Sequence, residues 1–132
     1  MTIGAVVHCI EAHRKRASHH PETLEAKCLF DADKLDCLGA IGVIRAAFVS
    51  FDHGQNFYKE IKDIDTYKKE NIRPDGTIID FSKHSSNLEW ELSIKEVPSR
   101  MFTPTGKRIA EGRAAFAADF YARYGQELKG IV

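Results

Sequence analysis

The stretch Leu24–Phe48, with the sequence LEAKCLFDADKLDCLGAIGVIRAAF, contains the features that decide the fold class of this chain. It is a strongly apolar, helix-forming run, yet it carries a cluster of carboxylates at Asp31, Asp33 and Asp36. In a continuous helix, with about 100° of rotation per residue, Asp33 lies at the centre of one face. The other members of that face are Leu29, Asp36, Cys37, Ala40 and Ile44. The pattern therefore predicts that Asp33 points into an apolar layer.

The first two carboxylates are predicted to have different environments. Asp31 falls on the opposite side of the same helix, near Lys27 and Lys34, where it can pair with a lysine and remain in solvent. Asp33 needs a further explanation, because a carboxylate turned into an apolar layer is costly unless a cation, a metal ion or several hydrogen bonds receive it. Asp33 is therefore the leading candidate for chemistry.

Length and composition limit the class of protein. With 132 residues, of which 43% are hydrophobic and 29% charged, we expect one soluble globular domain over 1–132. The formal net charge is zero, which argues against nucleic acid or an anionic membrane as the main partner. No window reaches the roughly 20 apolar residues of a membrane span, and nothing at the N-terminus resembles a secretion signal. We interpret Cys9, Cys28 and Cys37 as buried thiols in a reducing cytoplasm.

Helical periodicity covers most of the chain, so the predicted fold class is all-α. The first segments with this periodicity are 3–16, 22–50, 57–71 and 87–97. Gly39 and Gly42 mark the points where the second segment could bend, divide into two helices or pack closely. In the last segment, Trp90 is expected to anchor the helix to the core, and Pro98 to end it.

The remaining segments are a loop and a long final helix. Segment 72–85 is the least helical part, with a turn at Pro74-Asp75-Gly76 and a brief extended piece after it. Thr103 is a predicted N-cap, followed by Pro104 at the first position of the final helix. The apolar stripe of that helix consists of Ile109, Phe116, Phe120, Tyr124 and Leu128.

His13 is the first candidate partner for Asp33, because the periodicity of its own helix turns it towards the interior. Imidazole nitrogen and carboxylate oxygen are suitable ligands for a hard or borderline divalent metal in a sheltered place. The alternative is that His13 and Asp33 have structural roles only. A neutral core histidine would bond a carbonyl, and Asp33 would pair with an arginine such as Arg45 or Arg113. Spacing alone leaves both interpretations open.

The run that contains these carboxylates resembles a signature of the HD-superfamily metal-dependent phosphohydrolases. The closest subgroup carries the pattern DAD-(K/R)-LD-x-(L/I)-GAIG-x-x-R. Upstream, AVVHCIEAH and PETLEAK are similar to the same subgroup, and MFTPTGKRIAEGR resembles its C-terminal pattern. The resemblance spans most of the chain but is vague between 52 and 98. It implies an all-helical, HD-domain-like bundle.

The resemblance also implies an activity and its residues. Family members hold one or two divalent metals through a histidine, a His-Asp pair and a later aspartate, which matches Asp33. We therefore expect a metal-dependent phosphohydrolase acting on a nucleotide or another small phosphomonoester, with Mn, Mg, Fe, Co or Ni. Asp33 and His13 are the expected metal ligands. The catalytic candidates are Asp33, Lys34 and Asp36, and the substrate-binding candidates are Arg45 and His13.

Structural roles stay open for three of these residues. Lys34 could simply pair with Asp31. Arg45 could brace Asp36 or a neighbouring helix, and Asp36 could be a helix-surface acid.

The sequence departs from the family pattern upstream of Asp33. It contains no His-Asp dipeptide; His19-His20 lies in a turn before Pro21, and Asp52-His53 is reversed and falls downstream. We therefore expect an HD-type domain that lacks its N-terminal helices, with too few ligands for a tight metal site in one chain, so the metal could be absent. The apolar run 24–51 would then lack cover. That predicts a homodimer or higher oligomer, unless the aromatic residues of the final helix cover it.

Two functions follow from this sequence. The first is the phosphohydrolase, either impaired or completed by ligands from another subunit. The alternative is a non-catalytic helical module, left from a truncated HD domain, that serves oligomerisation or interaction.

Overall fold

The computed structural model describes residues 2–13 and 20–132. In this part of the chain there are six α-helices, two 3-10 helices and no strand, so the all-α prediction is confirmed. The α-helices are α1 (Ile3–Ala12), α2 (Leu24–Leu35), α3 (Gly39–Asp52), α4 (Ile64–Asn71), α5 (Ser86–Leu92) and α6 (Pro104–Leu128). The 3-10 helices are η1 (Phe81–Lys83) and η2 (Ile94–Arg100). Isolated bridges join Asn56 to Ser85 and Ile72 to Ile78.

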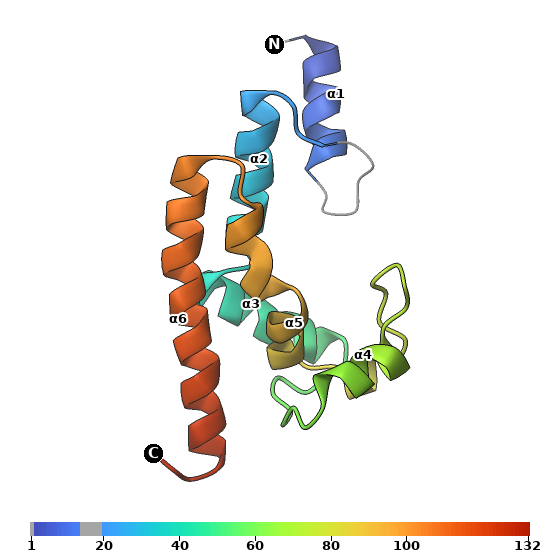
Figure 1. Ribbon diagram of the computed structural model, residues 1–132, viewed down its shortest axis with the longest axis vertical. Coiled ribbons are helices and arrows are strands. Elements are labelled where there is room, and N and C mark those ends of the chain that lie inside the picture. Colours follow the sequence, from blue (N-terminus) through green and yellow to red (C-terminus); the bar gives the residue numbers. More distant parts are fainter. Residues whose placement is uncertain (1, 14–19) are drawn as a thin grey trace.

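Helix α6 runs along the length of the molecule, and the other helices lie to one side of it (Figure 1). Helices α2, α3 and η2 contact α6 directly, and α1 contacts α2. Helix α4 and the turn after it lie on the side away from α6. The junction between α2 and α3 lies near the middle of the molecule in the same view. None of the helices within 2–13 and 20–132 is long and apolar enough to cross a membrane.

The predicted segment 22–50 is divided into two helices by a sharp junction. Helix α2 ends with Asp36 as its C-cap, and Leu38 has extended backbone angles before α3 begins. Gly39 has a φ of +69°, which residues with a Cβ rarely adopt. At Gly42 a Cβ would overlap the backbone carbonyl of Cys37, so a glycine is needed there for close packing. The helices divide before Gly39 and pack closely at Gly42, so alternatives that the sequence left open are confirmed at both glycines.

The core lies between α3, α5, η2 and α6, and α6 contributes two small residues and one aromatic residue to it. The buried cluster consists of Leu38, Val43, Trp90, Val97, Ala110, Ala117 and Tyr121. Of the predicted apolar stripe, Phe116 and Leu128 are 48% and 60% exposed, so these two residues lie outside the core. The small side chains of α6 let its backbone lie close to α2 and α3, so the large side chains are moved to the flanks. The prediction that Trp90 is an anchor is confirmed.

Several predicted boundaries shift for local reasons. Residues 57–63 are not helical, because Asp63 caps α4 by accepting hydrogen bonds from the amides of Asp65 and Thr66. Pro98 does not end the helical segment but lies inside η2. The capping prediction at Thr103 and Pro104 is confirmed, since the Thr103 hydroxyl accepts from the Gly106 amide.

The N-terminal predictions have mixed outcomes. Helix α1 ends at Ala12 with His13 as its C-cap, and the predicted helix end at 14–16 and the residues up to 19 lie outside the described residues. Of the cysteines predicted to be buried, Cys9 is buried, Cys37 is half-buried and Cys28 is exposed.

Candidate functional site

The structure reverses the predicted environments of the first two carboxylates. Asp31 is 2% exposed, so the prediction that it stays in solvent was wrong. Its carboxylate accepts hydrogen bonds from the amides of Phe102 (2.9 Å) and Thr103 (2.8 Å) and from the Thr103 hydroxyl (2.6 Å). These donors lie just before α6, so Asp31 fastens α2 to the beginning of the last helix. Three hydrogen bonds offset the cost of burying the carboxylate.

Asp33 does not point into an apolar layer, so that prediction was also wrong. Its side chain is 45% exposed and forms an ion pair of 2.6 Å with the Lys34 ammonium group. That ammonium also lies 5.1 Å from the centre of the Phe30 ring, a cation–π distance. Arg113, one of the two suggested structural partners, donates instead to the Leu35 carbonyl at 2.9 Å. Asp33 is therefore a partly exposed carboxylate near the α2–α3 junction.

Four of the predicted site residues gather around the Cys37 thiol at this junction. Burial raises the pKa of Cys37, and the nearby cations Arg45 and Lys34 oppose that rise. The carboxylates of Asp33 and Asp36 reinforce it. The Arg45 guanidinium lies 3.8 Å from the Cys37 sulfur. The sequence prediction thus placed these side chains in one neighbourhood, which carries both signs of charge.

His13 has a different setting from the other candidates. It caps α1, and its Nδ1 donates to the Ile10 carbonyl of the same helix at 2.5 Å. No group of three or more His, Cys, Asp or Glu side chains that could hold a metal ion is found within 2–13 and 20–132. The residues that the structure describes therefore do not make up a metal site by themselves.

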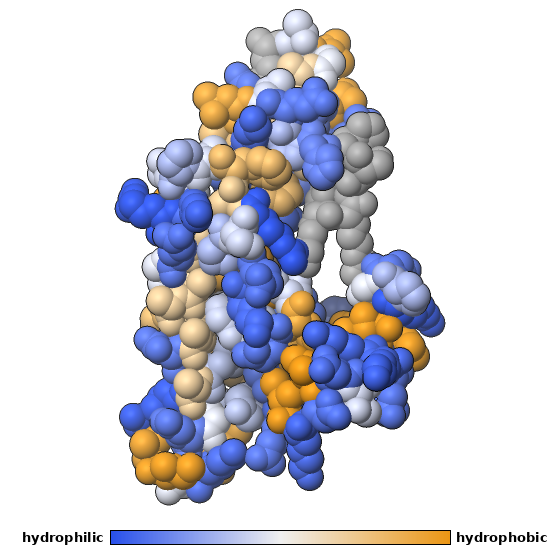
Figure 2. Space-filling view, viewed as in Figure 1, coloured by the Kyte–Doolittle hydropathy of each residue, from blue (hydrophilic) through white to orange (hydrophobic). Residues whose placement is uncertain are grey.

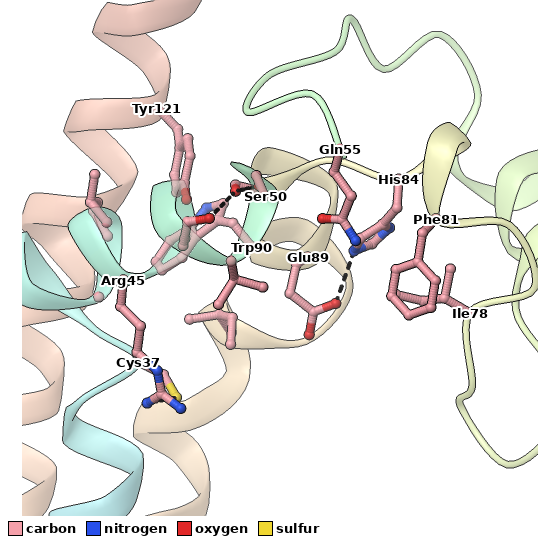
Figure 3. Close-up of a pocket in the computed structure, with 17 residues that line it drawn as sticks. Cys37, Arg45, Ser50, Gln55, Ile78, Phe81, His84, Glu89, Trp90 and Tyr121 are labelled. Carbon is pink, nitrogen blue, oxygen red and sulfur yellow. Dashed lines mark hydrogen bonds and ion pairs between the residues drawn. The ribbon is translucent and has the colours of Figure 1, made fainter. Parts of the chain in front are cut away.

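A pocket of about 240 Å³ opens beside the Cys37 cluster (Figure 3). We call it the central pocket; it lies between α3, α5 and α6 and the segment 78–84. Its apolar walls include Val43, Ala46, Val49, Ile78, Phe81 and Trp90. Its polar lining residues include Arg45, Ser50, Gln55, His84, Ser86 and Glu89. Among the predicted residues, Arg45 alone lines this pocket.

Polar residues that the sequence prediction missed hold the walls of the central pocket together. The Ser86 hydroxyl donates its one hydrogen to the Ala46 carbonyl at 3.1 Å. It therefore accepts the hydrogen bond of 2.6 Å from the Ser50 hydroxyl. This pair joins α3 to α5. On the α6 side, burial raises the pKa of Tyr121 to about 12, so its hydroxyl is protonated at neutral pH. No sequence signal marked Ser50, Ser86 or Tyr121, because their positions in the pocket depend on contacts between helices that are far apart in the chain.

The helical architecture and the α2–α3 junction define the class of fold. No protein-family model matches this chain. Its structure superposes with a TM-score of 0.60 on a Bacillus thuringiensis protein described as an HD-superfamily hydrolase. The two are 24% identical, with 81% of this chain and 47% of that one covered. The chain has an HD-like fold, as the sequence resemblance implied.

Two further relatives cover more of the chain. A Lactobacillus plantarum protein of known structure has a TM-score of 0.71 and 22% identity, over 98% of this chain and 63% of that one. Bacillus subtilis YpgQ, an uncharacterised protein, is 23% identical over 118 residues, which is 89% of this chain and 47% of YpgQ. A crystal structure of YpgQ in complex with ADP has a TM-score of 0.68. The chain thus spans about half the length of the curated relative that it matches.

Proposed function

We propose that this chain provides the substrate-binding part of an HD-type phosphohydrolase that acts on a nucleotide or another small phosphomonoester. The observation that carries the proposal is the central pocket, which combines apolar walls with a guanidinium at one end. Such a pocket suits a ligand with a flat apolar group and a phosphate. The complex of YpgQ with ADP supports a nucleotide as the ligand.

Arg45 is the proposed phosphate-binding group. Its side chain is exposed and lines the central pocket. The thiol beside it has a raised pKa, because Cys37 is partly buried, so the thiol stays neutral and does not offset the charge of the guanidinium. Lys34 is only 15% exposed and already pairs with Asp33, so we propose a supporting role for it at the edge of the phosphate site.

Binding of ADP is the test of this function. Trp90 lines the central pocket and is the chain's one tryptophan, so ADP is expected to change its fluorescence on titration. In Arg45→Gln the dissociation constant is expected to rise about tenfold or more, because a charge-assisted hydrogen bond to phosphate is lost.

Arg123→Gln is the matched control. Arg123 lies on the exposed side of α6, where it pairs with Glu127 at 2.7 Å, and it does not line the central pocket. Its substitution is expected to leave ADP binding unchanged. An equal loss in both variants, or no response of Trp90 to ADP, would contradict the proposal.

We also propose a divalent metal for the complete enzyme, with Asp33 and His13 among its ligands. The remaining ligands would come from residues beyond those described or from another subunit. Calorimetric titration of chelator-treated protein with Mn²⁺ is expected to show binding that Asp33→Asn removes. The corresponding change at an exposed position of α6, Asp119→Asn, should leave that binding intact. Retention of Mn²⁺ by Asp33→Asn would remove Asp33 from the ligand set.

A second candidate function is a helical interaction module that forms a homodimer or higher oligomer. An apolar stripe on α3 favours it: Ile41, Ile44, Phe48 and Phe51 are 55%, 59%, 70% and 87% exposed. Their spacing of three and four residues places them on one side of the helix, as in helix–helix interfaces. Figure 2 shows that apolar side chains reach the surface at several places on the face in view.

Light scattering is expected to give at least twice the 14.9 kDa mass of the chain. Phe48→Glu should reduce it to the mass of the monomer, because a carboxylate would be buried in the interface. Phe116→Glu, at a 48% exposed site on α6, should leave the mass of the oligomer unchanged. A monomeric mass for the unchanged protein would exclude this module.

A further inference from the structure

A row of hydrogen-bonded polar side chains ends in the central pocket and has no part in the function proposed above. It begins at Asn71, whose Nδ2 donates to the Tyr67 hydroxyl at 2.8 Å. That hydroxyl lies 2.7 Å from Nδ1 of His84. Nε2 of His84 in turn lies 3.2 Å from Oε2 of Glu89. His84 and Glu89 line the pocket, as Figure 3 shows, whereas Asn71 and Tyr67 are not among its lining residues.

The direction of each hydrogen bond in this row follows from its two ends. The Asp80 amide donates to Oδ1 of Asn71 at 2.9 Å, and Nδ2 of Asn71 donates to the Asp80 carbonyl at 3.0 Å. The Asn71 amide therefore has one orientation, and Nδ2 is the donor to Tyr67. At the other end the Glu89 carboxylate only accepts, so Nε2 of His84 carries the hydrogen. Nδ1 then accepts from the Tyr67 hydroxyl, and each polar group in the row has a partner.

The members of the row that support Glu89 are buried or half-buried, whereas Glu89 itself is accessible from the pocket. Asn71 and His84 are 2% and 3% exposed, and the rings of Tyr67 and His84 stack with 6.0 Å between their centres. The Glu89 side chain is 45% exposed. Among the described residues, no hydrogen bond holds its second oxygen, Oε1. A carboxylate that is fixed through one oxygen and leaves the other available is an acceptor site for a ligand.

We propose that Glu89 selects ligands that present an N–H donor to this part of the pocket, specifically the amino group of a purine base. This inference rests on the nucleotide function proposed above. The phosphate would lie towards Arg45, so the pocket would have a cationic and an anionic end that orient the ligand. A ligand without the donor would cover the carboxylate without pairing it, which is unfavourable. His84, Tyr67 and Asn71 are positioning residues, because they act on the ligand through Glu89.

The test compares two nucleotides that differ only in the proposed donor. ADP carries the 6-amino group, and purine riboside 5′-diphosphate lacks it. Titration followed by Trp90 fluorescence is expected to give about tenfold tighter binding of ADP by the unchanged protein, because a hydrogen bond to a charged group is at stake. In Glu89→Gln the difference is expected to fall to about threefold or less, since the acceptor is then neutral.

A second variant tests the positioning role. Tyr67→Phe keeps the stacked ring but removes the hydroxyl that donates to His84. It should weaken the preference for ADP and also change the tautomer of His84, observed in long-range ¹H–¹⁵N spectra. Tyr124→Phe, in an aromatic cluster with Phe57, should change neither.

The outcomes separate this inference from the proposed function. Equal binding of both nucleotides by the unchanged protein would overturn the selection by Glu89 while leaving nucleotide binding in place. A full preference for ADP in Glu89→Gln would overturn it as well. Failure of both nucleotides to bind would overturn the proposed function and this inference together.

Discussion

Replacing Asp31 with alanine is expected to lower the free energy of unfolding by about 4 kcal/mol, because it leaves several donors without a partner. Those donors are the amides of Phe102 and Thr103 and the Thr103 hydroxyl, all within 2.9 Å of the carboxylate. Asp31→Asn is expected to be nearly as harmful, since the new amide hydrogens would face backbone hydrogens. Urea unfolding, followed by circular dichroism, measures both.

Asp33→Ala is the control for this experiment. It changes the same residue type only two positions away, but the Asp33 side chain is 45% exposed and pairs with a single lysine. Its free-energy cost should stay below about 1 kcal/mol, as for other solvent-accessible ion pairs. If Asp33→Ala proved as destabilising as Asp31→Ala, the assignment of the structural carboxylate would be wrong.

Gly42→Ala is expected to lower the free energy of unfolding by about 3 kcal/mol, because the added methyl group would overlap the Cys37 carbonyl. The clash is with backbone rather than with a flexible side chain, so relief requires the α2–α3 junction to move. Thermal unfolding of Gly42→Ala beside the unchanged protein measures this loss of stability. Because Gly42 also lines the central pocket, the variant should bind ADP more weakly.

Gly112→Ala on α6 is the matched comparison for Gly42→Ala. A Cβ at Gly112 would meet no atom within 4 Å. The substitution should therefore stabilise the protein by about 0.5–1 kcal/mol, since alanine has the higher helix propensity. Opposite signs for the two substitutions support the junction geometry. A stabilising effect at Gly42 would contradict it.

Local chemistry made most of the helices predictable. The N-cap at Thr103 followed by Pro104 depends on nearby residues and was identified without knowledge of the fold. Gly39 was identified in the same way, as one possible point of division. The burial of Asp31 could not be identified in this way. Periodicity defines the faces of a helix but not which face meets a partner, and the partner here is the beginning of α6. The predicted face around Asp33 also included Ala40 and Ile44, which belong to α3. Because α3 runs in a different direction from α2, these residues do not share a face with Asp33.

The candidate site was predictable to a similar extent. The charged residues around Cys37 were found because they lie in one short run with an unusual composition. His84 was missed because it belongs to a segment without helical periodicity, and Glu89 was missed because nothing in its own predicted helix shows that it meets His84. The position of both depends on tertiary contacts. The hydrogen bonds of Asn71 to the backbone of Asp80 illustrate this dependence.

The contact between Asp31 and Thr103 also has a consequence for the order of folding. It joins residues that are 72 positions apart in the chain. During synthesis at the ribosome, α2 therefore emerges long before the donors that satisfy its buried carboxylate. Native closure around the α2–α3 junction must wait until the beginning of α6 has left the exit tunnel. Nascent chains stalled before that point should consequently remain sensitive to proteases.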